Sequence, residues 1–299
     1  MDSFIIASLI SFISTILVTP FMIRIAHRFG FVDKPNERKV HRTAMPRIGG
    51  VAFIIGTLAG MLFLTDLFEA DVRTTFFILL GSVPLLIIGL LDDRFILKAR
   101  YKLVAQLLTA LIVVSSGLTI EFISIPFGDR LDFGILSTVI TVFLARSIMN
   151  SINLIDGLDG LAAGVSIIAL ATMLVLATGN PAAYGLVFAF GVPLIGSVSG
   201  FLFYNFHPAK LFMGDTGSLF LGYMIAVLSI VGLFKSVTMI SLIIPLLILG
   251  VPIMDTFFAI IRRKLNHQNI GSPDKGHLHH CLLKKRIRPS ASRFNHLWS

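Results

Sequence analysis

Charged side chains and cysteine are both scarce in this chain of 299 residues. Only 14% of the residues are charged and 55% are hydrophobic, so the chain has too little polar surface for an ordinary soluble domain. Cys281 is the only cysteine, which excludes an internal disulfide and a cysteine-based metal cluster. The sequence also lacks a Walker A motif and a glycine-rich dinucleotide fingerprint. We therefore expect an all-α polytopic membrane protein.

Long apolar segments recur along the chain, and each approaches the roughly 20 residues that a transmembrane helix needs. The longest uncharged run is too long for one helix, but Gly179-Asn180-Pro181 divides it with a strong turn signal. Asp2 precedes the first segment where a secretory signal would carry basic residues, so we interpret that segment as a retained helix. The sequence predicts about nine spans, at residues 3–23, 48–65, 74–91, 103–120, 133–152, 161–178, 182–203, 217–234 and 236–254.

The basic residues predict which helix ends face the cytoplasm. If the N-terminus lies outside and nine helices cross the membrane, 22 of the 25 Lys and Arg residues fall on one side. Only Arg73, Arg130 and Lys235 lie opposite, and by the positive-inside rule the crowded side is cytoplasmic. The net charge of +9 then reflects this topology and attraction to anionic lipids of the inner leaflet. We expect the lipid bilayer as a partner and no nucleic acid.

Aspartates gather at the cytoplasmic ends of the predicted helices: Asp92, Asp93, Asp156, Asp159 and Asp215. One aspartate at a helix end is equally well a solvated stop signal, and Asp215 alone also fits a helix N-cap. Several carboxylates on one face of a membrane repel each other unless a cation relieves them, and charges at a bilayer are usually functional. Magnesium is often shared between one or two carboxylates and substrate phosphates. The pattern therefore predicts a Mg²⁺ site, with Mn²⁺ as an alternative.

The spacing of three residues between Asp156 and Asp159 would place both side chains on one face if the segment is helical. The glycines at 157, 160 and 164 permit a close approach of the backbone to a ligand or to a neighbouring helix. Ordinary helix packing explains the same glycines. We keep both interpretations of the glycines and take the two aspartates as candidate catalytic residues.

Basic and imidazole side chains accompany these aspartates. Lys98 and Lys102 follow the paired aspartates, where they fit a topogenic role or the binding of a lipid phosphate at the interface. His277, His279 and His280 lie among further Lys and Arg residues. That setting favours a phosphate-binding lining over a zinc site, because no other ligand has familiar zinc spacing. Phosphate groups are therefore the expected ligands of this side of the protein.

Six motifs, in this order, resemble those of the polyprenyl-phosphate N-acetylhexosamine-1-phosphate transferases. They are Lys39-Val40-His41, Pro46-Arg47-Ile48-Gly49-Gly50, Leu91-Asp92-Asp93, Asn153-Leu154-Ile155-Asp156-Gly157-Leu158-Asp159-Gly160-Leu161, Phe212-Met213-Gly214-Asp215-Thr216-Gly217-Ser218-Leu219 and His277-Leu278-His279-His280. Any one motif would be a weak signal, but their common order along roughly residues 10 to 285 is specific. The resemblance implies roles for several of the motif residues. The implied metal ligands are Asp215, Asp92 and Asp93, the catalytic positions Asp92, Asp93, Asp156 and Asp159, and the substrate-binding positions Asn153, His277, His279 and His280.

The reaction that this resemblance implies joins two anions. A phosphate oxygen of undecaprenyl phosphate attacks the β-phosphorus of a UDP-N-acetylhexosamine, UMP leaves, and a lipid-linked sugar diphosphate forms. GlcNAc is the expected sugar, because the branch that begins wall teichoic acid synthesis looks most similar, and the enterobacterial branch for surface antigens is also similar. Phosphoryl transfer needs mainly positioning and charge stabilisation, so direct attack is favoured over a covalent aspartyl intermediate. The expected location is the bacterial plasma membrane, with a cytoplasmic active site.

Three other functions stay open. The phospho-MurNAc-pentapeptide transferases belong to the same superfamily, but they typically carry three consecutive histidines where this chain has His277-Leu278-His279-His280. A transporter would place ionisable groups near the bilayer midplane, whereas Arg146 is the only charge well inside a predicted span. A non-catalytic membrane scaffold is the third alternative. The order and number of the motifs favour the hexosamine transferase.

The resemblance also predicts how the chain is organised. Residues 1–285 form the expected membrane-embedded transferase domain, and residues 286–299 form a polar cytoplasmic tail. Members of the family normally continue through about two further membrane helices after the histidine motif, so these C-terminal helices are expected to be missing here. A homodimer is compatible with this organisation.

Overall fold

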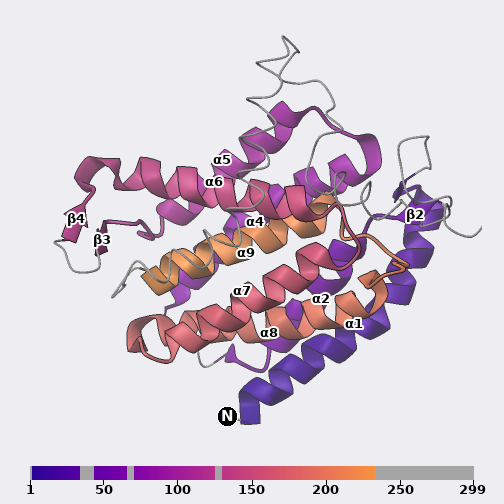
Figure 1. The fold of residues 1–299 in the computed structure, drawn as a ribbon, viewed down its shortest axis with the longest axis horizontal. Coiled ribbons are helices and arrows are strands. Elements are labelled where there is room, and N and C mark those ends of the chain that lie inside the picture. Colours follow the sequence, from indigo (N-terminus) through magenta and orange to yellow (C-terminus); the bar gives the residue numbers. More distant parts are fainter. Residues whose placement is uncertain (1, 34–43, 66–70, 125–129, 234–299) are drawn as a thin grey trace, which may run out of the picture. The chain divides into compact units, whose positions relative to one another are not determined.

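The computed structural model describes residues 2–33, 44–65, 71–124 and 130–233, and these are mostly helical (Figure 1). The α-helices are α1 (Asp2–Phe29), α2 (Gly49–Met61), α4 (Val72–Phe95), α5 (Ala99–Val114), α6 (Ser137–Ile155), α7 (Leu161–Ala177), α8 (Pro181–Asn205) and α9 (Gly214–Leu233). The short elements are the strands β1 (Val32–Asp33), β2 (Met45–Pro46), β3 (Phe122–Ser124) and β4 (Arg130–Asp132) and the 3₁₀ turn η1 (Gly134–Leu136). Two compact units divide the chain, Met1–Ile248 and Leu249–Ser299, and every described residue belongs to the first.

Each of the first eight predicted membrane segments coincides with one helix. Five helices are long and apolar enough to cross a bilayer: Asp2–Phe29, Val72–Phe95, Gly134–Ile155, Ala183–Asn205 and Gly214–Gly232. By contrast, α2, α5 and α7 have 13, 16 and 17 residues, fewer than the roughly 20 of a full span. The described part is therefore a helical membrane protein with five candidate spans. The count of nine and the orientation stay predictions, and the ninth segment (236–254) and the tail (286–299) lie outside the described residues.

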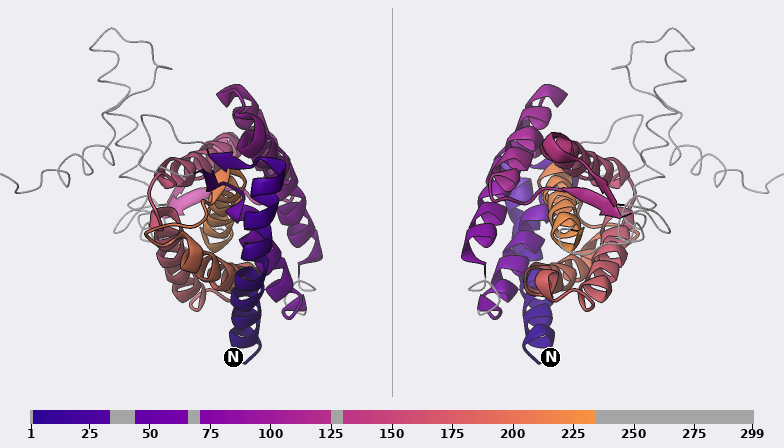
Figure 2. Two further views of the ribbon diagram at one scale, coloured as in Figure 1. Left: turned by 90° about the vertical axis from the view of Figure 1, so that its right-hand side faces the viewer. Right: turned by 90° about the vertical axis from the view of Figure 1, so that its left-hand side faces the viewer.

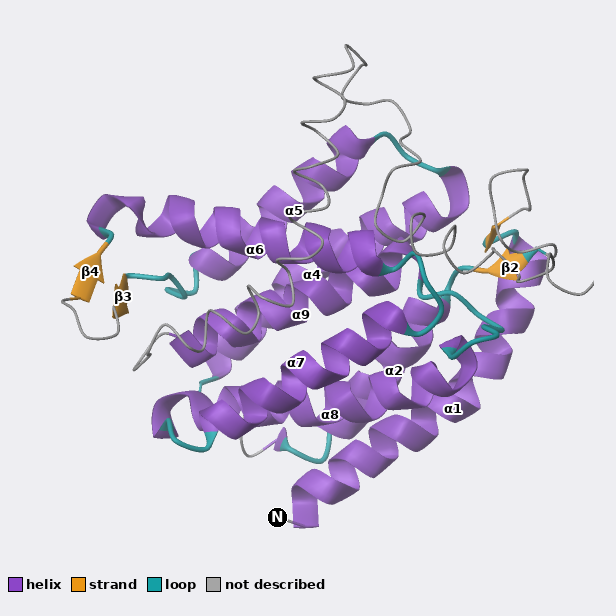
Figure 3. Ribbon diagram, in the orientation of Figure 1, coloured by secondary structure: helices purple, strands orange, loops and turns teal. Residues whose placement is uncertain are grey.

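The helix α5 ends earlier than the hydropathy predicts, at Val114 and not near residue 120. Ser116 donates its hydroxyl to a carbonyl three residues earlier, and Gly117 follows in the left-handed region with φ +99°. A hydroxyl that bonds to the last turn and a glycine with positive φ are both typical of a helix C-terminus. The apolar residues that follow lead into the antiparallel pair β3 and β4, drawn as arrows in Figure 3.

Small side chains bring α1 close to α2 and α8. One face of α1 buries Ala7, Ser11, Thr15 and Thr19, at a spacing of four residues. Glycines face this stripe: a Cβ on Gly60 of α2 would overlap the Ser11 hydroxyl, and one on Gly196 of α8 would overlap the backbone carbonyl of Ser8. Membrane helices associate largely through such close packing, because lipid offers no hydrophobic driving force between them.

The helix α9 is the most enclosed candidate span, and its whole apolar window is buried in the described structure. It packs against α2, α4, α6, α7 and α8, and Figure 2 shows it in orange among them. Gly50 of α2 and Gly217 of α9 meet at a backbone-to-backbone crossing, where a Cβ on either glycine would overlap the other. This crossing lies beside Asp215, so helix packing and the position of that carboxylate are coupled.

Replacing Gly50 by alanine should destabilise the protein by at least about 1–3 kcal/mol, because the added Cβ meets rigid backbone of Gly217. Gly164→Ala is the matched control, since nothing lies within 4 Å of a Cβ at that helical position. Alanine there should be neutral or stabilise by up to about 1 kcal/mol through its higher helix propensity. Thermal unfolding in detergent would test both variants. Equal stability of the two would show that the α2–α9 crossing tolerates a wider spacing.

A backbone connection fixes the segment that precedes α9 onto the start of α2. Phe212 N donates to Pro46 O at 2.8 Å, and Gly49 N donates to Phe212 O at 3.0 Å. Pro46 itself belongs to β2, which pairs antiparallel with β1. Residues 45–50 and 211–214 are therefore held together, although more than 160 positions separate them in the sequence.

Candidate functional site

Asp92 and Asp93 lie in the last turn of α4, and both are buried. The helix ends just after them, where Ile96 adopts a left-handed φ of 53°. Asp92 Oδ1 accepts a hydrogen bond from Leu97 N at 2.7 Å, and Asp92 Oδ2 lies 2.9 Å from Lys102 Nζ. Asp92 thus stabilises the turn between α4 and α5 and binds the cation that α5 supplies.

The Asp93 carboxylate holds the start of α9. It accepts hydrogen bonds from Asp215 N at 2.7 Å, Thr216 N at 3.1 Å and Thr216 Oγ1 at 2.7 Å. Gly214 precedes them with φ +74°, and a Cβ there would lie 2.6 Å from an Asp93 oxygen. The first N–H groups of a helix need such acceptors. Asp93 supplies from another helix what an N-cap residue supplies locally, which leaves the Asp215 carboxylate for other contacts.

Two cations face the Asp215 carboxylate. Lys102 Nζ donates to Asp215 Oδ2, while Arg47 Nη2 lies 3.6 Å from Asp215 Oδ1 and 4.0 Å from Asp93 Oδ1. Burial by itself lowers the pKa of Lys102, but the carboxylates of Asp215 and Asp92 outweigh it and raise that pKa. Lys102 is therefore a cation that joins the end of α4 to the start of α9.

Asp156 follows α6 directly and adds a fourth carboxylate. Burial and the negative charges of Asp215 and Asp93 raise the pKa of Asp156 well above its usual value, and Arg47 opposes that rise. We call the six residues of this group the polar cluster: Asp92, Asp93, Asp156, Asp215, Arg47 and Lys102. Four carboxylates face two cations, so two formal negative charges are not balanced within the cluster. A further cation or proton would be stabilised here.

Asn153 lies one turn before Asp156 and connects α6 to α9. Its Nδ2 donates to Ser218 Oγ at 2.8 Å, and that hydroxyl donates in turn to Gly214 O at 3.0 Å. The predicted substrate-binding residue Asn153 is thus fixed beside the start of α9. The same contact holds the end of α6, which Asp156 follows, to the first turns of α9.

The structure separates Asp156 from Asp159, which the sequence spacing would pair on one helix face. The helix α6 ends at Ile155 and α7 begins at Leu161, so both aspartates lie in the loop between them. Gly160 is needed in this loop because its φ is +72°. The glycines at 157 and 164 have open space around a hypothetical Cβ, so they mediate no close contact within the described residues.

Asp159 takes part in a second group of polar contacts, on the loop between α8 and α9. Its Oδ2 accepts hydrogen bonds from His207 Nδ1 at 3.0 Å and from Ala209 N at 3.1 Å. Gly160 N donates to Asn205 Oδ1 at 3.0 Å, which holds the same two loops together. His207 was not among the residues predicted from the sequence. The signal that could have identified it is its place as a lone histidine just before the motif that contains Asp215.

The structure brings most of the described candidate residues together, but it places Asp159 in the second group and leaves Lys98 apart from both. Lys98 is exposed at the N-cap position of α5 and, among the described residues, makes no ion pair with the polar cluster, whereas Lys102 lies within it. Arg47 is a cluster residue that the sequence reading named only as part of a motif. The three candidate histidines His277, His279 and His280 lie outside the described residues.

A metal site of three or more Asp, Glu, His or Cys side chains is not found in the described part of the chain. Asp93 is committed to the start of α9, which leaves Asp92 and Asp215 as the carboxylates on either side of the Lys102 ammonium. Magnesium is commonly held by only one or two carboxylates, with waters and substrate phosphates completing its shell. These two carboxylates and the unbalanced negative charge fit an ion of that kind.

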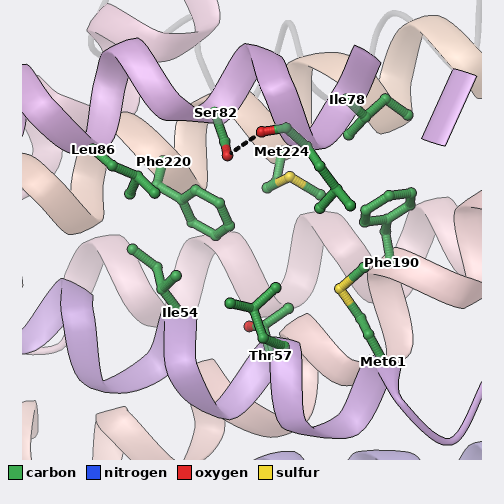
Figure 4. Close-up of a pocket in the computed structure, with 11 residues that line it drawn as sticks. Ile54, Thr57, Met61, Ile78, Ser82, Leu86, Phe190, Phe220 and Met224 are labelled. Atoms are coloured by element: carbon green, nitrogen blue, oxygen red, sulfur yellow. Dashed lines mark hydrogen bonds between the residues drawn. The ribbon is translucent and has the colours of Figure 1, made fainter. Parts of the chain in front are cut away.

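An apolar pocket lies between α2, α4, α8 and α9 (Figure 4). Its polar lining atoms include the hydroxyls of Thr57 and Ser82, and both are already bonded. Thr57 bonds to Phe53 O and Ser197 Oγ, and Ser82 donates to Leu79 O. The pocket therefore offers no free group for acid, base or phosphate chemistry, and the polar cluster is the better candidate site.

Comparisons with known proteins identify the family to which the chain is similar. Residues 75–233 match glycosyl transferase family 4. The chain is 49% identical over 280 residues to "Probable undecaprenyl-phosphate N-acetylglucosaminyl 1-phosphate transferase" of Bacillus subtilis (strain 168), covering 93% of this chain and 77% of that protein. It is 35% identical over 287 residues to "Decaprenyl-phosphate N-acetylglucosaminephosphotransferase" of Mycobacterium tuberculosis (strain ATCC 25618 / H37Rv), covering 87% and 70%. It is 37% identical over 261 residues, 81% and 78% of the two chains, to "Phospho-N-acetylmuramoyl-pentapeptide-transferase" of Caldanaerobacter subterraneus subsp. tengcongensis.

Proposed function

This chain belongs to glycosyl transferase family 4, and from that premise we propose that it transfers GlcNAc-1-phosphate from UDP-GlcNAc to undecaprenyl phosphate, releasing UMP. The observation that carries the proposal is the polar cluster, in which Lys102 and Arg47 lie among carboxylates at the ends of membrane helices. A phosphate on a lipid and a diphosphate in water meet at such an interface. The cluster supplies cations for both.

The residues of the cluster have separable roles in this reaction. A phosphate oxygen of the lipid forms a bond to the β-phosphorus of UDP-GlcNAc, the bond from that phosphorus to the UMP oxygen breaks, and UMP leaves with the electron pair. Lys102 and Arg47 stabilise the charge on the transferred and leaving phosphates. Asp156, whose pKa is raised, is suited to accept the proton of the acceptor phosphate, a monoester with a second pKa near 6. Asp93 keeps the start of α9 in place.

Magnesium, or manganese in its place, completes the proposal. Asp215 and Asp92 would hold the ion, and its charge would screen the two anionic substrates from each other. The unbalanced negative charge of the polar cluster supports this assignment. Lys102, which contacts both of these carboxylates, would donate to a phosphate oxygen when the substrates are bound.

We propose that the reaction takes place at the cytoplasmic face of the bacterial plasma membrane. Support comes from the positive-inside count and from Arg47 and Lys102, which adjoin helix ends on the lysine- and arginine-rich side. The product is a lipid-linked sugar diphosphate, which is the kind of compound that the first step in the synthesis of wall teichoic acid or another surface glycan would make. Further transferases that extend this sugar would consume it.

Asp215→Asn should lower lipid-dependent UMP release by at least about 100-fold, because the amide loses the charge that holds Lys102 and the metal. The assay uses purified protein in detergent with UDP-GlcNAc, undecaprenyl phosphate and Mg²⁺, with a no-lipid and an EDTA control. Glu121→Gln is the matched control, since Glu121 is exposed and lies outside the cluster. Release that persists in Asp215→Asn, or that needs no lipid, would contradict the proposal.

A comparison of donors separates the two transferase branches. The same preparation is given UDP-GlcNAc or UDP-MurNAc-pentapeptide at equal concentration, and UMP is measured. Faster release from UDP-GlcNAc is expected, given the higher identity to the N-acetylglucosaminyl relative. Preference for UDP-MurNAc-pentapeptide would instead assign the chain to the peptidoglycan branch.

A further inference from the structure

The loop between α8 and α9 is fixed against both parts of the site. Asn205 accepts from Gly160 N at 3.0 Å and donates to Leu211 O at 2.9 Å, so one side chain connects this loop to the loop that carries Asp159. At its other end, Phe212 bonds to the backbone at the start of α2. Both ends of the loop are therefore held by hydrogen bonds to other parts of the described structure.

The imidazole of His207 is held within this loop with one nitrogen facing outward. The Asp159 side chain is only 10% exposed, whereas that of His207 is 81% exposed. Nδ1 lies 3.0 Å from Asp159 Oδ2, so Nδ1 carries the hydrogen directed to the carboxylate. A carboxylate that fixes one imidazole nitrogen also fixes the direction of the other. Nε2 is thus the nitrogen available to a ligand.

His207 lies on the water side of the membrane segment that ends at Asn205. Lys210, also exposed, adds a cationic side chain to the same loop. The acceptor lipid reaches the site from the bilayer, whereas the nucleotide sugar arrives from water. The position of this loop therefore suits binding of the nucleotide. Its polar and charged side chains suit the phosphates of the nucleotide better than the apolar faces of its rings.

We infer that His207 binds the diphosphate of the nucleotide-sugar donor through Nε2, and that Asp159 is the residue that positions it. This inference rests on the proposed function and deepens it. With hydrogen on both ring nitrogens, Nδ1 donates to Asp159 and Nε2 donates to a phosphate oxygen. Asp159 is consequently a positioning residue and not a proton acceptor in the transfer.

Two substitutions at His207 separate substrate binding from loop structure. His207→Asn keeps an N–H near the position of Nδ1 for Asp159 but has no group at Nε2. In His207→Gln, the longer side chain places its amide near the position of Nε2. We expect His207→Asn to raise the KM for UDP-GlcNAc about tenfold, with kcat and the KM for undecaprenyl phosphate within about threefold of wild type. His207→Gln should recover part of the loss. His27→Asn, at an exposed histidine in the last turn of α1, is the matched control.

Binding of UDP to the purified protein, measured by calorimetry, gives a readout independent of turnover. His207→Asn and Asp159→Asn should each weaken it about tenfold, and the double variant should lose little more, because both act through one imidazole. Unchanged donor KM and UDP affinity in His207→Asn would overturn the inference, as would equal losses for both substrates with a lower melting temperature. A wild-type protein that binds UDP through His207 but transfers no sugar would contradict the proposed function alone.

Discussion

Lys102→Met should lower lipid-dependent UMP release by about 100- to 1,000-fold, the largest loss of activity that the structure predicts for a basic residue. Lys102 Nζ contacts both Asp92 and Asp215, so its removal leaves two buried carboxylates facing each other without their shared cation. In the proposed reaction, it also removes a charge that stabilises the transferred phosphate. The measurement is kcat/KM for UDP-GlcNAc in detergent at saturating lipid.

Lys98→Met is the comparison that makes this prediction specific. Lys98 lies one helical turn earlier in the sequence but outside the polar cluster, so its replacement should change kcat/KM by less than about threefold. Lys102→Arg should keep the charge and restore only part of the activity, because a guanidinium differs in shape from an ammonium. Similar losses in Lys98→Met and Lys102→Met would mean that general attraction to anionic substrates, and not the contact with Asp92 and Asp215, determines the rate.

Asp93→Ala should destabilise the protein by about 3–5 kcal/mol, a larger loss of stability than any other single carboxylate substitution in the described residues. The substitution leaves two backbone N–H groups and one hydroxyl at the start of α9 without their acceptor. Asp93 is only 4% exposed, so water cannot readily replace it. Thermal unfolding in detergent gives the change in stability.

Asp71→Ala is the variant with which the loss of stability in Asp93→Ala is compared. Asp71 is the N-cap of α4 and accepts from Thr74 N at 3.0 Å, so its loss should cost about 1 kcal/mol, as for an ordinary cap. Asp93→Asn is a third variant, which retains one acceptor oxygen and should fall between the two. If Asp93→Ala has the same melting temperature as Asp71→Ala but loses all activity, Asp93 acts on the substrates and its role at α9 is secondary.

The helices could be predicted largely from the sequence because uncharged segments of membrane length have few other structures open to them. Each of the first eight predicted segments became a helix. The lengths were predicted less well, because local groups decide where a helix ends. The Ser116-Gly117 pair ends α5 early, and α2 stops after 13 residues although the apolar sequence continues.

The candidate site was predicted as a set of charged helix ends, but the partners within it were not. Lys98 and Lys102 are equivalent in the sequence, and only the start of α5 at Ala99 distinguishes the residue before the helix from the one inside it. Asp93 and Asp215 are both aspartates at helix ends, yet the first binds the backbone of α9 and the second binds cations. The role of His207 depends on its contact with Asp159, which lies 48 positions away in another loop. No local sequence pattern predicts such a contact.

The backbone bonds between Phe212 and the start of α2 impose an order on biogenesis. Pro46 and Gly49 emerge from the ribosome and enter the membrane long before Phe212 exists, since synthesis proceeds from the N-terminus. The newly made chain must therefore keep these groups hydrated or transiently paired while five further helices of the described structure, α4 to α8, are added. Only the arrival of Phe212, just before α9, closes the connection. A chain interrupted before residue 212 would hold most of the described helices and still lack Asp215, and with it a complete polar cluster.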